Sequence, residues 1–349
     1  MINPSDTENS SPLNVDEPRS IPEYNTPKNP METRESRQRL SSRLKSGLHK
    51  FWILFALMTY TAGIGSGYLF WGRTDGSEPG SGETAYAAEM QSLAAQINPE
   101  EGYQLPITYG NIGPEMLAAG VIDLEQFVQL YEEMGRPLSQ EQLDILTQGS
   151  DQPVVINSQN QHFILNLFWA FGLSNQNVIL TEGPMMRDGE DKVVNFASTG
   201  GWTLAKEPVS EIYASLTMVS LTAEQQERLE QVALAVYRPC CDNPTFFPDC
   251  NHGMAMLGLL ERMAFHGATV EQMFEAAKYI NAFWFPGQTL EIAIALKAEN
   301  GLEFEQMDGE QVVGKGLSSG SGFQAVHQWL AQSGKLPQLS QGGGSCGVQ

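Results

Sequence analysis

Basic side chains are scarce in this 349-residue sequence, in which 20 Lys and Arg residues face 41 Asp and Glu residues, for a formal net charge of −21. The imbalance lies beyond residue 72, where 12 basic side chains face 34 acidic ones. Because binding to nucleic acid requires a basic surface, the composition argues against nucleic acid as a partner. An acidic field of this size concentrates cations and favours a cationic ligand or a metal ion.

Large apolar side chains are nearly absent from residues 1–48, which are rich in Ser, Pro, Asn, Glu and Arg. Such a segment cannot bury enough surface to offset its chain entropy, and we expect a disordered tail. Charge is absent from residues 51–71, whose sequence is FWILFALMTYTAGIGSGYLFW. As a helix this run would span about 31 Å, roughly the hydrocarbon thickness of a bilayer. We therefore predict a membrane anchor over residues 49–72.

The side chains that flank this apolar run indicate its orientation. The six Lys and Arg residues nearest to its N-terminal end are Arg34, Arg37, Arg39, Arg43, Lys45 and Lys50. The positive-inside rule then predicts a single-pass protein of the cell membrane, with residues 1–48 in the cytoplasm and the C-terminal domain outside it. A cleaved signal peptide is the alternative, but the apolar run is long for one. Gly63 and Gly67 form a small-xxx-small pair through which two such helices could dimerise.

Strand signals are few beyond the anchor. After a Gly/Ser/Glu-rich segment that predicts a flexible linker over residues 73–90, helix-type apolar spacing dominates residues 91–336. Short strand-like runs occur only at 154–156 and 178–180. The sequence therefore predicts an extracytoplasmic domain that is all-α or nearly so, followed by a Gly/Ser-rich tail over residues 337–349. Helices are expected over 139–148, 160–173, 207–218, 222–237, 253–266, 269–285, 288–300 and 320–333, three of them with capping boxes, at Ser139/Gln142, Thr222/Gln225 and Thr269/Gln272.

Cysteine is rare, yet three of the four cysteines fall within eleven residues, in a CC-x8-C-x-H pattern. Three prolines keep the intervening chain out of helix, so that a loop can return Cys240 and Cys241 to Cys250 and His252. Thiolate and imidazole are ligands of zinc and Cu(I), and this set of four would complete a tetrahedral site, with Cys346 as a possible further ligand. The familiar C-x2-C spacing is absent. The leading hypothesis is a membrane-anchored metal-binding protein.

Two alternatives remain open at the same residues. Cys250 lies at the start of an expected helix, where a thiolate is favoured, and with Cys240 or Cys241 it could act as a thiol-disulfide oxidoreductase. Alternatively, a disulfide between these cysteines would close a loop of about ten residues and stabilise by about 2–3 kcal/mol. That would leave a disulfide-stapled helical scaffold that binds partners and has no chemistry at the cysteines. The sequence itself assigns no enzymatic activity.

Overall fold

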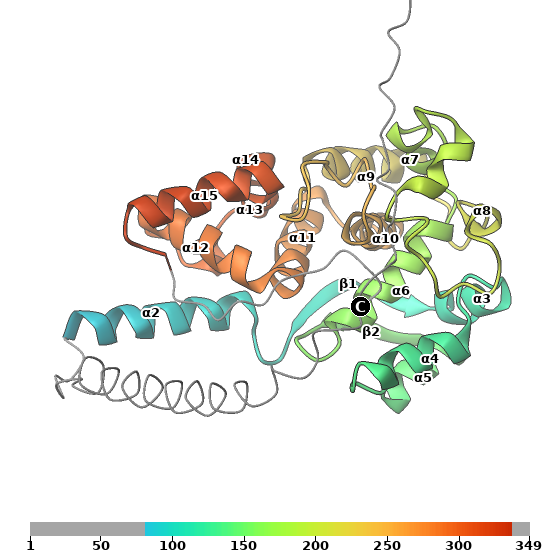
Figure 1. Ribbon diagram of the computed structural model, residues 1–349, viewed down its shortest axis with the longest axis horizontal. Coiled ribbons are helices and arrows are strands. Elements are labelled where there is room, and N and C mark those ends of the chain that lie inside the picture. Colours follow the sequence, from blue (N-terminus) through green and yellow to red (C-terminus); the bar gives the residue numbers. More distant parts are fainter. Residues whose placement is uncertain (1–80, 337–349) are drawn as a thin grey trace, which may run out of the picture. The chain divides into compact units, whose positions relative to one another are not determined.

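The computed structural model describes residues 81–336, and in this range the chain is mostly helical (Figure 1). The described strands form one two-stranded sheet, so the predicted nearly all-α fold class is confirmed for this part of the chain. The predicted tail, the anchor, the Gly63/Gly67 pair and Cys346 lie outside the described residues. No helix within residues 81–336 is long and apolar enough to cross a bilayer.

The elements of the described residues follow one another in this order: α2 (Ser81–Ile97), β1 (Tyr103–Gly110), α3 (Ile112–Ala118), α4 (Leu124–Glu133), α5 (Gln140–Thr147), β2 (Ser150–Ile156), α6 (Gln161–Ser174), α7 (Val178–Thr181), the 3-10 turns η1 (Pro184–Met186) and η2 (Glu190–Asn195), α8 (Val209–Ile212), α9 (Ala223–Ala235), α10 (Asn251–Phe265), α11 (Val270–Trp284), α12 (Pro286–Asn300), the 3-10 turn η3 (Phe304–Gln306), α13 (Gly309–Val313), α14 (Lys315–Ser318) and α15 (Gly320–Gln332).

The three predicted capping boxes start α5, α9 and α11. In each, the Ser or Thr side chain accepts a hydrogen bond from the backbone N–H three residues on, and the Gln at that position bonds back to the cap. Each box satisfies two backbone N–H groups that a helix would otherwise leave without a partner. These helices therefore begin where the sequence places them.

Other boundaries differ from the prediction. Helix α2 begins at Ser81, so a helix occupies part of the segment expected to be a flexible linker. Its alanines favour helix, and its Leu93 and Ile97 are fully buried against the C-terminal helices. The strand predicted at 178–180 is wrong, because Asn177 caps a short helix there by accepting from the Ile179 N–H. The helix predicted over 207–218 is reduced to α8.

The sheet joins β1 and β2 in antiparallel register, with Tyr103 opposite Ile156. The sequence predicted only the end of β2 and missed β1. In β1, Leu105, Ile107 and Tyr109 alternate with more exposed neighbours, so one face of the strand is buried. Pro106 within this short run hides that alternation in the sequence, since proline weakens a strand assignment.

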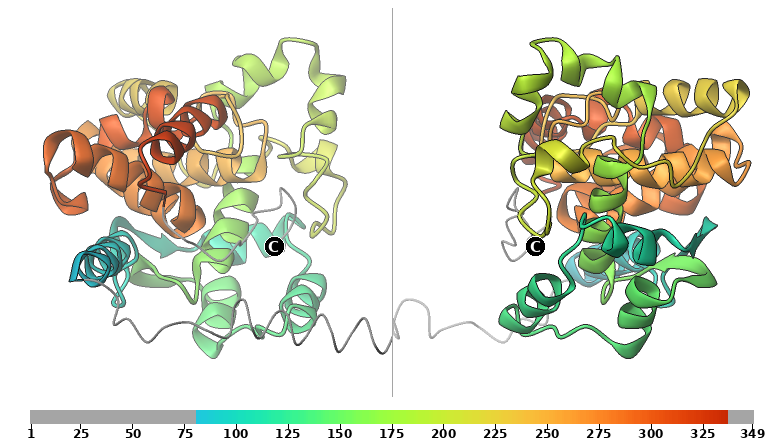
Figure 2. Two further views of the ribbon diagram at one scale, coloured as in Figure 1. Left: turned by 60° about the vertical axis from the view of Figure 1, so that its left-hand side comes forward. Right: turned by 90° about the vertical axis from the view of Figure 1, so that its right-hand side faces the viewer.

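The buried apolar side chains of the described residues form two clusters. The larger one centres on α6 and α10, and the smaller one joins α2 to α12 and α15. In both views of Figure 2, the C-terminal helices (orange to red) lie to one side of the strand pair and α3–α5 (cyan to green). The segment between α9 and α10, residues 236–250, is called the cysteine loop because it carries Cys240, Cys241 and Cys250. It leads into the start of α10, which belongs to the larger cluster.

Helices α6 and α10 cross at two glycines. A methyl group at Gly172 would lie 2.2 Å from the Met254 carbonyl oxygen, and one at Gly258 would lie 2.6 Å from the Phe168 carbonyl oxygen. No side chain larger than hydrogen fits at either position, so the backbones of the two helices are in contact. This contact fixes α10, and with it the residues at its N-terminus.

A buried carboxyl group also lies on α10. Glu261 is fully buried and accepts a 3.1 Å hydrogen bond from the Asn175 side chain, while its second oxygen has no hydrogen-bond partner among the described residues. Burial raises the pKa of the Glu261 carboxyl well above its ordinary value of 4.5. The folded state therefore holds this carboxyl in its neutral form.

We expect Glu261→Gln to stabilise the protein increasingly as the pH rises above about 4.5. In the unfolded chain the carboxyl ionises above that pH, whereas in the folded chain it stays neutral, so wild-type stability falls with rising pH. Glutamine matches the shape of the neutral acid and does not ionise. Urea unfolding at pH 4 and pH 8 measures the difference; an equal effect at both values would contradict a neutral Glu261.

Candidate metal centre

The segment between α9 and α10 returns on itself, as its prolines predicted. The Thr245 N–H donates to the Val236 carbonyl at 2.8 Å, and the Phe246 N–H donates to the Ala233 carbonyl at 2.9 Å. These bonds fold the loop back along the end of α9. The chain then enters α10 with Cys250 as the N-cap residue, whose sulfur accepts from the Gly253 N–H at 3.4 Å.

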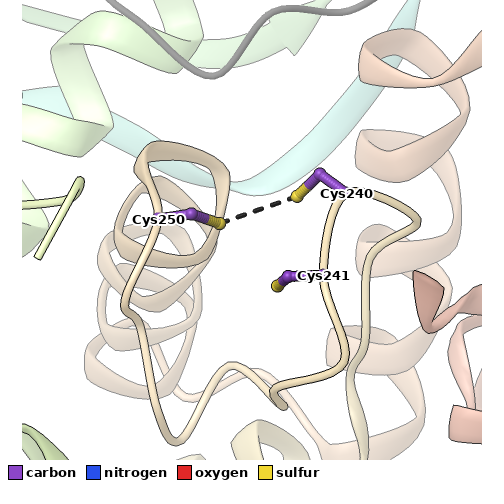
Figure 3. Close-up of side chains that lie close together, drawn as sticks. All are labelled: Cys240, Cys241 and Cys250. Atoms are coloured by element: carbon purple, nitrogen blue, oxygen red, sulfur yellow. Dashed lines mark hydrogen bonds between the residues drawn. The ribbon is translucent and has the colours of Figure 1, made fainter. Parts of the chain in front are cut away.

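This loop brings three predicted ligands together. The sulfurs of Cys240, Cys241 and Cys250 all lie within 4.8 Å of one another, and the Cys240 and Cys250 sulfurs are 3.6 Å apart. Figure 3 shows Cys250 at the start of α10 and the other two cysteines on the facing loop. Zinc–sulfur bonds of about 2.3 Å at tetrahedral angles place sulfurs about 3.8 Å apart, so only small shifts would bring the group to metal geometry.

None of the three described cysteines forms a disulfide. Cys250 is buried, with 7% of its surface exposed, whereas Cys240 and Cys241 are half-buried. The group therefore has an inner member on a helix and two outer members on a loop. A disulfide-stapled scaffold is not what the structure contains at these cysteines.

His252, the fourth predicted ligand, is not part of the sulfur group. Its ring lies 4.6 Å from the Phe285 ring and 5.6 Å from the Trp284 ring, and it is buried. Its Nδ1 has no hydrogen-bond partner among the described residues. Burial lowers the pKa of His252 to about 4, so the imidazole is neutral at pH 7 and has a lone pair. The structure thus assembles three of the four predicted ligands and places the fourth against aromatic rings.

Arg238 is the residue of this centre that the sequence did not predict. It is 1% exposed, and its Nε donates to the Cys250 sulfur at 3.2 Å. Its terminal nitrogens donate to the Asn243 carbonyl at 2.9 Å, to the Phe247 carbonyl at 3.5 Å and to the Asp249 carboxylate at 3.1 Å. One buried guanidinium therefore holds both ends of the cysteine loop.

The surroundings of Cys250 favour its thiolate. Hydrogen bonds from the Cys240 and Cys241 thiols, together with the charge of Arg238, outweigh burial and hold the pKa of Cys250 well below its ordinary value of 9. Burial alone would lower the pKa of Arg238, but the three neighbouring sulfurs raise it, and the guanidinium stays charged. The two groups form a buried charge-assisted pair.

Cys241 has the opposite tendency. The hydrogen bond with Cys240 lowers the pKa of Cys241. The hydrogen bond with Cys250 and burial outweigh this effect and raise the pKa to about 11. The Cys241 thiol also donates hydrogen bonds to the Asn243 carbonyl oxygen at 3.9 Å and to an Asp249 carboxylate oxygen at 4.0 Å. Burial raises the pKa of Asp249 more than Arg238 lowers it. Without a bound cation, the group holds the Cys250 thiolate beside the protonated thiol of Cys241.

The loop is also tied to the C-terminal helices. The Asp242 carboxylate accepts from the Ser321 N–H and hydroxyl, both at 2.7 Å, at the start of α15. The Gly320 N–H donates to the Cys241 carbonyl at 2.8 Å. A loop fixed at α9, α10 and α15 holds its sulfurs in place before any ligand arrives.

Three sulfurs in one preformed group can bind a soft metal ion or exchange electrons as a thiol pair. In the sequence, Arg238 could have been suspected as part of the site because it directly precedes the Pro-Cys-Cys segment in an acid-rich region. Its burial, however, depends on the fold. No family model, curated protein or solved structure matches this chain.

Proposed function

We propose that this protein binds a soft metal ion, zinc or Cu(I), through Cys240, Cys241 and Cys250. The observation that carries this proposal is the mutual distance of the three sulfurs, all within 4.8 Å, in a loop held by hydrogen bonds at three helices. Thiolates are preferred ligands of both ions. A bound cation would deprotonate Cys241 and Cys240, since a coordinating thiol loses its proton to the metal.

Charge balance favours a divalent ion. Three thiolates beside the buried guanidinium of Arg238 leave two negative charges, which Zn²⁺ would neutralise and Cu(I) would only halve. Zinc also takes four ligands. The lone pair of the nearby His252 or a water molecule would supply the fourth ligand, and a water ligand leaves a position open to a substrate.

We further propose that the centre lies outside the cytoplasm, on a domain anchored by residues 51–71. The charge-free run and the basic residues that precede it support this location. Thiols in such a compartment tend to oxidise, and a bound metal would protect them. The acidic domain would favour the approach of the cation.

Metal analysis of the full chain with Cys250→Ser tests the proposal. Serine is itself a good N-cap residue, so this variant removes the ligand while keeping the start of α10. We expect about one equivalent of zinc or copper per native chain, and about a tenth of that or less in the variant. Cys346→Ser serves as the matched control and should retain the metal. Equal metal content in native protein and Cys250→Ser would refute the site.

A further inference from the structure

We infer that Cys240 and Cys250 are a thiol-disulfide couple, and that their oxidation by an external disulfide expels the metal ion. The ion-release half of this inference rests on the metal site proposed above. The couple itself rests on the positions of the sulfurs and of the groups that donate to them.

The two sulfurs are already close to bonding distance. Cys240 and Cys250 have their sulfurs 3.6 Å apart, and a disulfide bond is about 2.05 Å long, so closure requires a movement of about 1.5 Å. Cys240 lies on the loop between Pro239 and Cys241, and a change in its side chain and loop backbone can supply that movement without displacing α10. The pair faces directly across the loop opening (Figure 3).

Cys240 is better placed than its neighbour Cys241 to pair with Cys250. The Cys241 sulfur points toward two acceptors, the Asn243 carbonyl and the Asp249 carboxylate, at 3.9 Å and 4.0 Å. Cys241 would have to give up these two contacts to pair with Cys250, whereas the Cys240 and Cys250 sulfurs already lie 3.6 Å apart. The structure therefore favours one of the three possible disulfides.

Burial gives the two cysteines different roles. Cys240 is half-buried, and an external disulfide can reach it, whereas Cys250 is 7% exposed. The Cys250 sulfur receives hydrogen bonds from Arg238 Nε at 3.2 Å and from the Gly253 N–H at 3.4 Å. A guanidinium and a helix N-terminus both stabilise negative charge on this sulfur. Cys240 is thus the entry cysteine and Cys250 the resolving one.

The exchange proceeds in two displacements. The Cys240 thiolate attacks one sulfur of the external disulfide, whose S–S bond breaks, and the far half leaves with the electron pair as a thiolate. The Cys250 thiolate then attacks the Cys240 sulfur and expels the second half. In the balance, the external disulfide gains two electrons and the protein pair loses two. One released half takes up the proton that Cys240 gives up before it attacks. Cys250 is already a thiolate and gives up no proton, so the other half leaves as a thiolate.

Oxidation removes two of the three metal ligands. A disulfide sulfur carries no thiolate charge, so Cys241 alone would remain as an anionic ligand, while Arg238 would keep its positive charge beside the ion. Metal binding requires deprotonated ligands, and a single thiolate does not hold zinc in competition with water. The centre would accordingly bind metal when reduced and release it when oxidised.

The test uses the full chain as Cys346→Ser, loaded with zinc and titrated with oxidised glutathione. Disulfides are mapped by peptide mass spectrometry, and a chromophoric chelator reports released zinc. We expect a Cys240–Cys250 disulfide to dominate and about one equivalent of zinc to leave with it. Adding Cys241→Ser should leave that disulfide unchanged, whereas adding Cys240→Ser should lower oxidation at Cys250 at least about tenfold.

A dominant Cys241–Cys250 or Cys240–Cys241 disulfide would overturn the inference, as would thiols that remain reduced. Zinc that stays bound after the Cys240–Cys250 bond forms would overturn the release step. The failure of the proposed metal site looks different: the reduced chain would then bind no zinc at all, while disulfide mapping would still decide the couple.

Discussion

Arg238→Ala is expected to lower the free energy of unfolding by about 3–5 kcal/mol, the usual cost of removing one partner from a buried charged pair. The substitution leaves the Cys250 thiolate and the Asp249 carboxylate without their cation and two loop carbonyls without a donor. It also leaves a cavity, because the side chain is 1% exposed and among the largest fully buried ones. Urea unfolding of the metal-free protein measures the loss.

Two further variants keep this prediction specific. Arg187→Ala removes an exposed arginine and should change stability by less than about 0.5 kcal/mol. Arg238→Lys keeps the positive charge but loses the planar set of guanidinium donors. Its free energy of unfolding should therefore lie between those of the native protein and Arg238→Ala. If enough Arg238→Ala folds, its zinc affinity should drop about 10- to 100-fold, the usual effect of losing a partner that orients a ligand. If Arg238→Ala lowered the free energy of unfolding by less than about 1 kcal/mol, the claim that the buried Arg238 guanidinium holds the cysteine loop would be contradicted.

Gly172→Ala should destabilise the protein by about 3 kcal/mol, at the upper end of overpacking effects. The added methyl group would lie 2.2 Å from the Met254 carbonyl oxygen. This oxygen belongs to the backbone and cannot relieve the overlap by a change of rotamer, as a side chain can. Helix α6 would have to move away from α10, which carries Cys250 at its start. Thermal unfolding checks the loss, and metal analysis checks whether the centre is disturbed with it.

Gly316→Ala is the matched control, since Gly316 also lies in a helix and has nothing within 4 Å of an added methyl group. Alanine there should be neutral or slightly stabilising, because it is the better helix former. A stability of Gly172→Ala equal to that of the control would mean that the α6–α10 crossing is looser than the structure describes.

Local signals predicted local structure well. The capping boxes at Ser139, Thr222 and Thr269 each mark the start of a helix, because the hydrogen bonds that make the cap involve only residues three apart. Strand β1 was missed because its stability comes from pairing with β2, some forty-five residues further on. Pairing over such separations leaves little trace in a single sequence.

The candidate site was predicted in part for the same reason. The three clustered cysteines and the prolines between them are local, and the loop they predict is present. Arg238 is also close in sequence, but its burial and its four acceptors depend on how the loop closes over it. The position of His252 against Trp284 and Phe285 depends on the packing of α10 with the junction of α11 and α12, which no sequence pattern indicates.

X-ray absorption at the metal edge of the purified full chain tests the central claim most directly. The account predicts about three sulfur neighbours at about 2.3 Å from the metal, from Cys240, Cys241 and Cys250. A first shell of oxygen and nitrogen alone, as carboxylates on the surface of this acidic chain would provide, would contradict it.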